Sequence, residues 1–251
     1  MKPAAAPNGS DDFRSLPCTQ SLIHRGRPRS VQTIDVDALV NLAKEWGGVI
    51  EVLVAVGDTV VELMPVLHVF GARQPIDERR LRNGIALGGE RTFDQDPKYA
   101  IRLLVDIAIK ALSPAVNDPT TAVQALDQIQ DLLLRLGCRH LEIGKFRDSD
   151  GKLRLVFPFP AWADLLRLAL DEIRVYGAGS VQVMRRMNAL VNDLVTVLPE
   201  GRRPALRHWD VRLKNTIARS FTDGEDQQEA SQEDRQGLGM PRDSSGYSQV
   251  A

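Results

Sequence analysis

Apolar residues recur every three or four positions over most of the segment from Asp77 to Phe221, which is the spacing of one buried face of an α-helix. The helices predicted from this spacing span residues 97–112, 119–136, 161–176, 180–198 and 204–221. The first two begin at Asp-Pro pairs, because aspartate caps a helix and proline is tolerated at the first helical position. The pattern therefore predicts a bundle of about five helices.

A shorter region before it, residues 31–76, has a different pattern. A short helix is predicted to begin at Asp35 or Asp37 and to end at Gly47-Gly48. Two β-rich runs, Val49–Val54 and Val66–Phe70, then flank the turn dipeptide Gly57-Asp58. This pattern predicts a small α+β module, a short helix followed by a hairpin-like fragment of a barrel. The predicted fold class is mainly α with this module in front.

Within the helical region, one further hairpin is predicted near residues 141–157, centred on the polar turn Asp148–Gly151. The two ends of the chain lack periodicity and are predicted to be disordered. The predicted organisation is a leader at 1–30, the α+β module at 31–76, the helical domain at 77–221 and a tail at 222–251.

Charge and cysteine content add little to this organisation. The formal net charge is −1, but the tail carries seven acidic residues against two arginines, so the remainder is mildly basic and too diffuse to indicate nucleic-acid binding. Two cysteines fit a reducing compartment. No stretch has the roughly 18 uninterrupted apolar residues of a membrane span, and no secretory signal is evident. The chain as given is expected to be soluble and cytoplasmic.

Polar residues gather around the two Asp-Pro helix starts. The candidate ligand-binding set consists of Glu90, Arg91, Asp94, Asp96, Arg102, Asp106, Asn117, Asp118 and Thr120. One interpretation is a pocket where two helix N-termini converge and bind an anion or a metal. The favoured interpretation is helix capping together with ion pairs between residues four apart on a solvated face.

The sequence lacks the residue patterns of the common metal, phosphate-binding, nucleophile and carrier sites. Cys138 and His140 have no paired cysteines or histidines at metal-binding spacing, so no metal site is predicted. No phosphate-binding glycine loop and no Gly-x-Ser-x-Gly nucleophile motif occurs. The Gly57-Asp58 turn resembles half of a biotinyl- or lipoyl-type barrel, but no lysine lies between Pro3 and Ala43 to carry a swinging arm. No cofactor and no catalytic residue is expected.

Two stretches together resemble domain-of-unknown-function family 2254, a family of predicted bacterial membrane proteins. They are Glu90–Pro97 and Leu103–Ala122, in which Ala-Leu-Ser-Pro-x-x-Asn-Asp-Pro at 111–119 is the most recognisable part. The resemblance extends over about 31–221 and implies a soluble half that follows several hydrophobic spans, with no established activity. Those spans are missing here, and Leu63 stands where a glycine is usual before Met64-Pro65.

The missing spans leave two alternatives, a truncated reading frame whose intact form lies in the plasma membrane, or a stand-alone soluble paralogue. The leading functional hypothesis is a non-enzymatic role in the assembly or regulation of a membrane protein, with a homo-oligomer or a membrane protein as partner. The alternative is a ligand-binding or hydrolytic site at Asp96 and Asp118. A third hypothesis is weak peripheral binding to anionic membranes through Arg25, Arg27 and Arg29.

Overall fold

The computed structural model describes residues 12–239, and these residues form two compact units. The first unit contains the chain up to Tyr99 together with Leu141–Pro160. The second contains Ala100–His140 and the residues from Ala161 onward. The chain thus passes from one unit to the other three times. This division differs from the predicted boundary at residue 77, because residues 77–99 and the hairpin near 141–157 both belong to the first unit.

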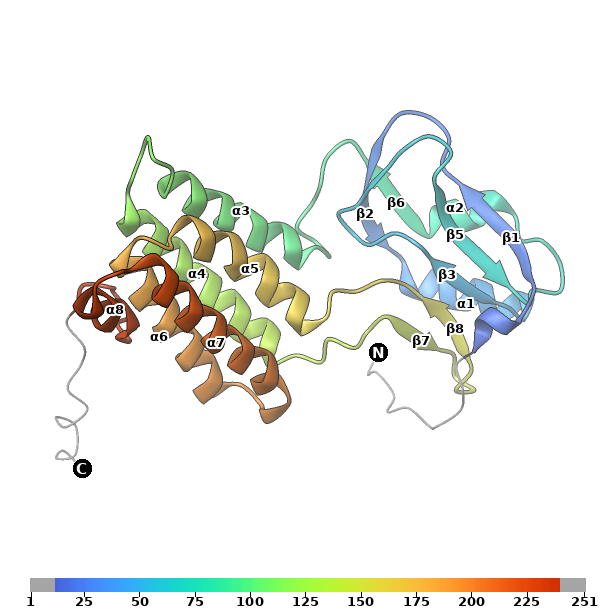
Figure 1. Cartoon of the computed structure of the whole chain (residues 1–251). Coiled ribbons are helices and arrows are strands. Elements are labelled where there is room, and N and C mark those ends of the chain that lie inside the picture. The colour runs from blue at the N-terminus through green and yellow to red at the C-terminus, as the bar shows by residue number, and fades with distance from the viewer. Residues whose placement is uncertain (1–11, 240–251) are drawn as a thin grey trace, which may run out of the picture. The chain divides into compact units, whose positions relative to one another are not determined.

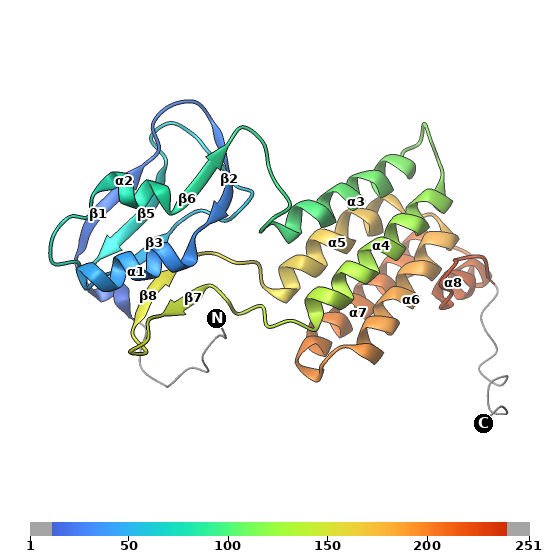
Figure 2. The same cartoon turned by 180° about the vertical axis from the view of Figure 1, so that it is seen from behind.

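The first unit is built from strands with two helices (Figures 1 and 2). Its elements are a 3-10 turn η1 (Phe13–Ser15), strands β1 (Cys18–Ile23) and β2 (Arg29–Ile34), helix α1 (Val36–Trp46), strands β3 (Val49–Val52), β4 (Thr59–Val60) and β5 (Pro65–Phe70), helix α2 (Glu78–Asn83), and strands β6 (Ile85–Gly88), β7 (Lys145–Arg147) and β8 (Leu153–Val156). Five strands form one sheet in the order β1-β5-β3-β8-β7, and three form a second in the order β4-β2-β6.

Local sequence explains the predicted elements of this unit. The Asp35 carboxylate accepts the Ala38 backbone N–H at 2.9 Å and caps α1, and Gly47 ends the helix with φ +75°. Strands β3 and β5 pair antiparallel, as the two apolar runs predicted. Leu63 adopts φ +66°, so this leucine occupies the left-handed conformation that favours glycine.

The predicted disordered leader is wrong for its described part. Residues 18–23 form the edge strand β1 on β5, and residues 29–34 form β2, which pairs with both β4 and β6. Val31 and Ile34 of β2 are fully buried in the core of this unit. Of the three arginines of the membrane-binding hypothesis, Arg25 and Arg27 lie exposed in the connection between β1 and β2, and Arg29 is the exposed first residue of β2. Residues 1–11 lie outside the described residues.

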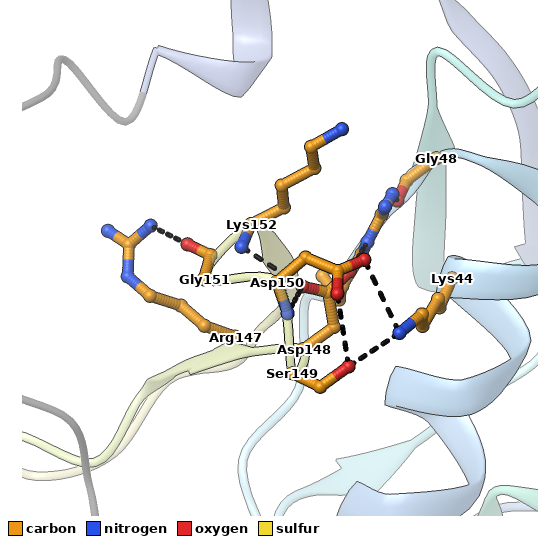
Figure 3. A network of polar contacts seen from close by, with 9 residues as sticks. Lys44, Gly48, Arg147, Asp148, Ser149, Asp150, Gly151 and Lys152 are labelled. Atoms are coloured by element: carbon orange, nitrogen blue, oxygen red, sulfur yellow. Dashed lines mark hydrogen bonds and ion pairs between the residues drawn. The ribbon is translucent and has the colours of Figure 1, made fainter.

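The remote hairpin of β7 and β8 is fixed to the module by polar contacts (Figure 3). Strand β8 pairs parallel to β3, about 100 residues earlier in the chain. Arg154 donates to Asp148 at 2.7 Å and to the Gly48 carbonyl at 3.0 Å, while Lys44 on α1 donates to Ser149 at 2.6 Å. Burial raises the pKa of Asp148, but hydrogen bonds from Arg154 and two backbone N–H groups outweigh it, so this pKa lies below its usual value.

The second unit is helical within the described residues (Figures 1 and 2). Its helices are α3 (Pro97–Ala111, whose first three residues belong to the first unit), α4 (Pro119–Gly137), α5 (Trp162–Tyr176), α6 (Val181–Val197), a 3-10 turn η2 (Glu200–Arg202), α7 (Arg203–Ser220) and α8 (Gly224–Ser231). Helix α6 packs against α4, α7 and α8. Fully buried aliphatic side chains on facing positions form the core, among them Ile129, Leu166 and Leu190.

The structure is therefore mainly α with some β, as the sequence predicted, and five predicted helices form within two residues of their expected bounds. The predicted disordered tail is wrong for residues 223–239, because α8 forms there and packs on α6 and α7. A sixth helix thus joins the predicted five. Residues 240–251 lie outside the described part of the chain.

Candidate functional site

The nine residues of the candidate set fall into three groups. Glu90, Arg91, Asp94 and Asp96 belong to the first unit. Arg102 and Asp106 lie on α3 in the second unit, and Asn117, Asp118 and Thr120 lie at the turn between α3 and α4.

Asp96 is the most buried carboxylate of the set, with no exposed side-chain surface. One of its oxygens accepts the Tyr99 backbone N–H at 3.1 Å, which caps α3. The other accepts two N–H groups of Arg91, at 3.1 Å from Nε and 2.5 Å from Nη2. Both oxygens are thereby engaged, so Asp96 holds the start of α3 and the segment before it in place.

The Gly57-Asp58 turn closes over this ion pair. Gly57 has φ +88°, and a Cβ atom at this position would overlap the Asp96 carboxylate and the Arg91 guanidinium. Asp58 accepts the Ala55 backbone N–H at 2.8 Å and lies 3.6 Å from the Lys98 ammonium. Only glycine allows this close approach, which explains the Gly-Asp dipeptide without a carrier function.

An aromatic pair extends the same cluster toward solvent. Tyr99 stacks on Phe93 with ring centroids 4.8 Å apart, and the Arg91 guanidinium lies 4.8 Å from the Tyr99 ring centre. Phe93 is 61% exposed, which is unusual for a large aromatic side chain. Asp94 and Glu90 beside it are exposed, and the Glu90 carbonyl accepts a 2.9 Å hydrogen bond from Gln32.

In the second unit, Arg102 links two helices. Its guanidinium donates to Asp106 on its own helix α3 and to Glu172 on α5. These hydrogen bonds raise the pKa of Arg102 above its ordinary value, so the group is charged at any physiological pH. The ion pair between residues four apart is present at Arg102 and Asp106, and Arg102 also pairs with Glu172 of the neighbouring helix.

The third group surrounds the start of α4. Asp118 accepts the Thr121 backbone N–H at 3.1 Å and the Thr121 hydroxyl at 2.5 Å. These hydrogen bonds hold the pKa of Asp118 below its usual value, the hydroxyl having the larger effect. Asn117 precedes it with φ +47°, a left-handed conformation that asparagine tolerates. Asn117 and Thr120 are exposed.

The two helix N-termini do not converge. Asp96 precedes the first residue of α3, whereas the Asp118 N–H bonds to the carbonyl of Ala111, the last residue of that helix, at 2.8 Å. Helix α3 has 15 residues. At a rise of about 1.5 Å per residue, roughly 22 Å of helix separates the two carboxylates. Both carboxylates are engaged as helix caps, as the favoured interpretation has it, and the shared pocket stays a prediction.

A row of polar residues that the sequence did not reveal crosses three strands of the five-stranded sheet. Ser21 on β1 lies opposite His68 on β5, and its hydroxyl is 2.8 Å from the His68 Nδ1 atom. Glu51 on β3 lies opposite His68 on the other side, and its carboxylate accepts from Arg14. The three residues come from segments up to 47 positions apart, so only strand register brings them together. Ser21 and His68 are hydrogen-bonded across the strands, whereas the Glu51 carboxylate is engaged by Arg14. The row is therefore explained by structural pairing.

The described residues were also compared with the requirements of a metal site and of a membrane-spanning helix. Among residues 12–239, no cluster of three or more His, Cys, Asp or Glu side chains is arranged to hold a metal ion. Cys18 and Cys138 are both free and exposed. In the same part of the chain, none of the helices combines the length and the apolar character needed to cross a lipid bilayer.

Comparison with known proteins gives the family. The pattern described as "Predicted membrane protein (DUF2254)" matches residues 2–193. An uncharacterised protein of Mycobacterium bovis and one of Mycobacterium tuberculosis are each 30% identical over 204 residues, which is 78% of this chain and 39% of the relative. A second M. tuberculosis protein is 33% identical over 150 residues, 59% of this chain and 29% of the relative. The chain thus spans about two fifths of the length of these relatives. No solved structure matches. The chain belongs to domain-of-unknown-function family 2254, whose members are described as predicted membrane proteins.

Proposed function

We propose that this chain is a non-enzymatic module that serves the assembly or regulation of a membrane protein of its family. The observation that supports it is the engagement of three charged groups of the candidate set in structural contacts. Asp96 is a cap and an ion-pair partner, Asp118 is a cap, and Arg102 joins two helices. A catalytic carboxylate has instead to reach a substrate, within about 3 Å of the proton it moves. The contacts of Asp96, Asp118 and Arg102 instead fix where α3 and α4 begin and hold α3 against α5.

The test replaces carboxylates of the set without removing structure. Asp118→Asn keeps the helix cap, since asparagine caps about as well as aspartate. Asp106→Asn and Asp94→Asn are matched changes at half-buried and exposed positions. We expect all three variants to restore the phenotype of a strain that lacks the gene and to keep the wild-type melting temperature. If Asp118→Asn keeps that temperature but fails to restore the phenotype, the carboxylate binds a ligand or a substrate, and the proposal is overturned.

A second experiment tests the membrane partner directly. The chromosomal gene is given a C-terminal epitope tag, and native cells are separated into soluble and membrane fractions. We expect the tagged chain in the membrane fraction, because the proposed partner is a membrane protein. A 27.8 kDa product that stays in the soluble fraction at low salt would contradict an assembly role at the membrane.

A further inference from the structure

The C-terminal segment 223–239, here called the strap, is held on α6 by polar contacts. Arg185 of α6 donates Nε to the Glu229 carbonyl at 2.7 Å and pairs with the Glu229 carboxylate. Asn188 donates to the Ala230 carbonyl at 3.1 Å. Asn192 donates to the Glu233 carboxylate at 2.6 Å. Three donors along α6 thus bind acceptors of the strap: Arg185 binds the Glu229 carbonyl and carboxylate, Asn188 binds the Ala230 carbonyl, and Asn192 binds the Glu233 carboxylate.

The three donors lie on one side of α6. Arg185, Asn188 and Asn192 are spaced three and four residues apart, which places them on one helix face. We call this set the docking face. Its neighbour Asp193 accepts both Nε and Nη2 of Arg235 from the strap, at 3.1 and 2.7 Å. The docking face thus matches an acidic segment in register, because two glutamates four residues apart meet Arg185 and Asn192.

Apolar packing contributes little to the strap. Ala230 is the one buried residue of α8, and Leu238 beyond it is 54% exposed. Helix α8 has eight residues, and isolated helices shorter than about 12–15 residues are marginal in water. Helix α8 is therefore expected to form only while it is docked. The strap's own ion-pair groups, Glu229 and Arg235, are 46% and 65% exposed, whereas their partners Arg185 and Asp193 on α6 are 9% and 19% exposed, so salt screens these contacts in part.

The strap and its docking face also differ in their relation to the family. The family pattern ends at residue 193, so it includes Arg185, Asn188 and Asn192 but none of residues 223–239. The docking face is hence part of the shared region, and the strap that covers it is not. A covering segment that lies outside the shared region and is held by charge has the properties of an occupant that can be displaced.

We propose that residues 223–239 form a detachable strap over the docking face of α6, and that its release opens this face to an acidic helical segment of another protein. The chemistry of the partner is defined by the strap itself, with one glutamate in the last turn of a short helix and a second glutamate four residues later, just beyond the helix end. This inference does not depend on the proposed assembly role, because it concerns two parts of the same chain.

The experiment uses the full chain with Glu229→Arg and Glu233→Arg, which reverse the two contacting charges. Glu225→Arg with Asp226→Arg is the matched control, since it makes the same charge change in the strap at two exposed positions whose side chains are not hydrogen-bonded to α6. Hydrogen exchange should show the amides of 224–239 losing protection by about ten-fold or more in the first variant, with α6 unchanged. The control should keep most of the wild-type protection.

The opened face is then probed with a labelled synthetic peptide of residues 223–239. The wild-type chain should bind it weakly, because the tethered strap competes at a millimolar effective concentration. The Glu229→Arg, Glu233→Arg chain should bind it about ten-fold more tightly at about 0.1 M salt than at about 1 M salt. Unchanged protection of the strap in that chain would overturn the proposal. So would peptide binding no tighter than that of the wild-type chain.

Discussion

The two Asp-Pro helix starts carry the same local signal and end in different environments. At each start an aspartate caps a helix and a proline follows at the first helical position. The Asp96 side chain has no exposed surface and pairs with Arg91, while Asp118 is partly exposed and its carboxylate bonds to Thr121 in its own turn. Identical dipeptides therefore predict where helices begin. They do not predict which aspartate is essential to the fold.

The largest expected effect separates the two aspartates directly. Asp96→Ala removes a cap worth about 1 kcal/mol and leaves the Arg91 guanidinium without its carboxylate, so we expect the free energy of unfolding to fall by about 2–4 kcal/mol. Asp118→Ala removes only a solvated cap and should lower stability much less. Urea unfolding of both variants measures the difference. Equal losses would mean that burial of Asp96 contributes nothing beyond its cap.

An intermediate effect is expected at the glycine that contacts Asp96. Gly57→Ala introduces a Cβ into the Arg91–Asp96 pair and places alanine at a positive φ. Gly151→Ala is the control, because Gly151 also has a positive φ, +75°, and has open space around it. Both variants should lose about 1 kcal/mol from the strained φ, and Gly57→Ala should lose about 1–2 kcal/mol more from the overlap. Equal melting temperatures for the two variants would show that the turn moves away at no cost.

The smallest expected effect is in the pH dependence of stability. Because the folded pKa of Asp118 lies below the unfolded value of about 3.9, its contribution is present above that value and is lost as the pH falls through the folded pKa. Asp118→Asn should reduce the loss of stability between about pH 5 and pH 3, measured by urea unfolding at each pH. Thr121→Val removes the hydroxyl donor alone and should give part of this reduction. An unchanged acid profile in both variants would mean that these hydrogen bonds do not persist in solution.

Much of the fold could be predicted because its signals are local. A cap and a repeat of apolar residues are both contained within one helix, so α3 to α7 begin and end near their predicted residues. Strand β1 and helix α8 lack such signals. Only one residue of each is buried, Leu22 and Ala230, and their contacts come from β5 and α6, about 45 residues away in the chain.

The sequence predicted which residues of the candidate set act as helix caps, but not the surroundings in which they lie. The sequence identified Asp96 and Asp118 as helix caps, and hydrogen bonds to Tyr99 and Thr121 confirm this. It placed them at opposite ends of the predicted helix 97–112, but it could not show that Asp96 is buried beside Gly57 while Asp118 stays partly exposed, because burial depends on distant segments. Its favoured interpretation, capping and paired charges, agrees with the contacts that these side chains make.

The sequence by itself determined the positions of the main helices, the β-rich runs and the turn glycine, since each depends on interactions within a few residues. Only the tertiary structure decided that the hairpin at 145–156 joins β3, that α8 docks on α6, and which aspartate is buried. These outcomes depend on hydrogen bonds and ion pairs between distant segments. The free energy of such contacts depends on what each segment excludes from water, and no local pattern contains that information.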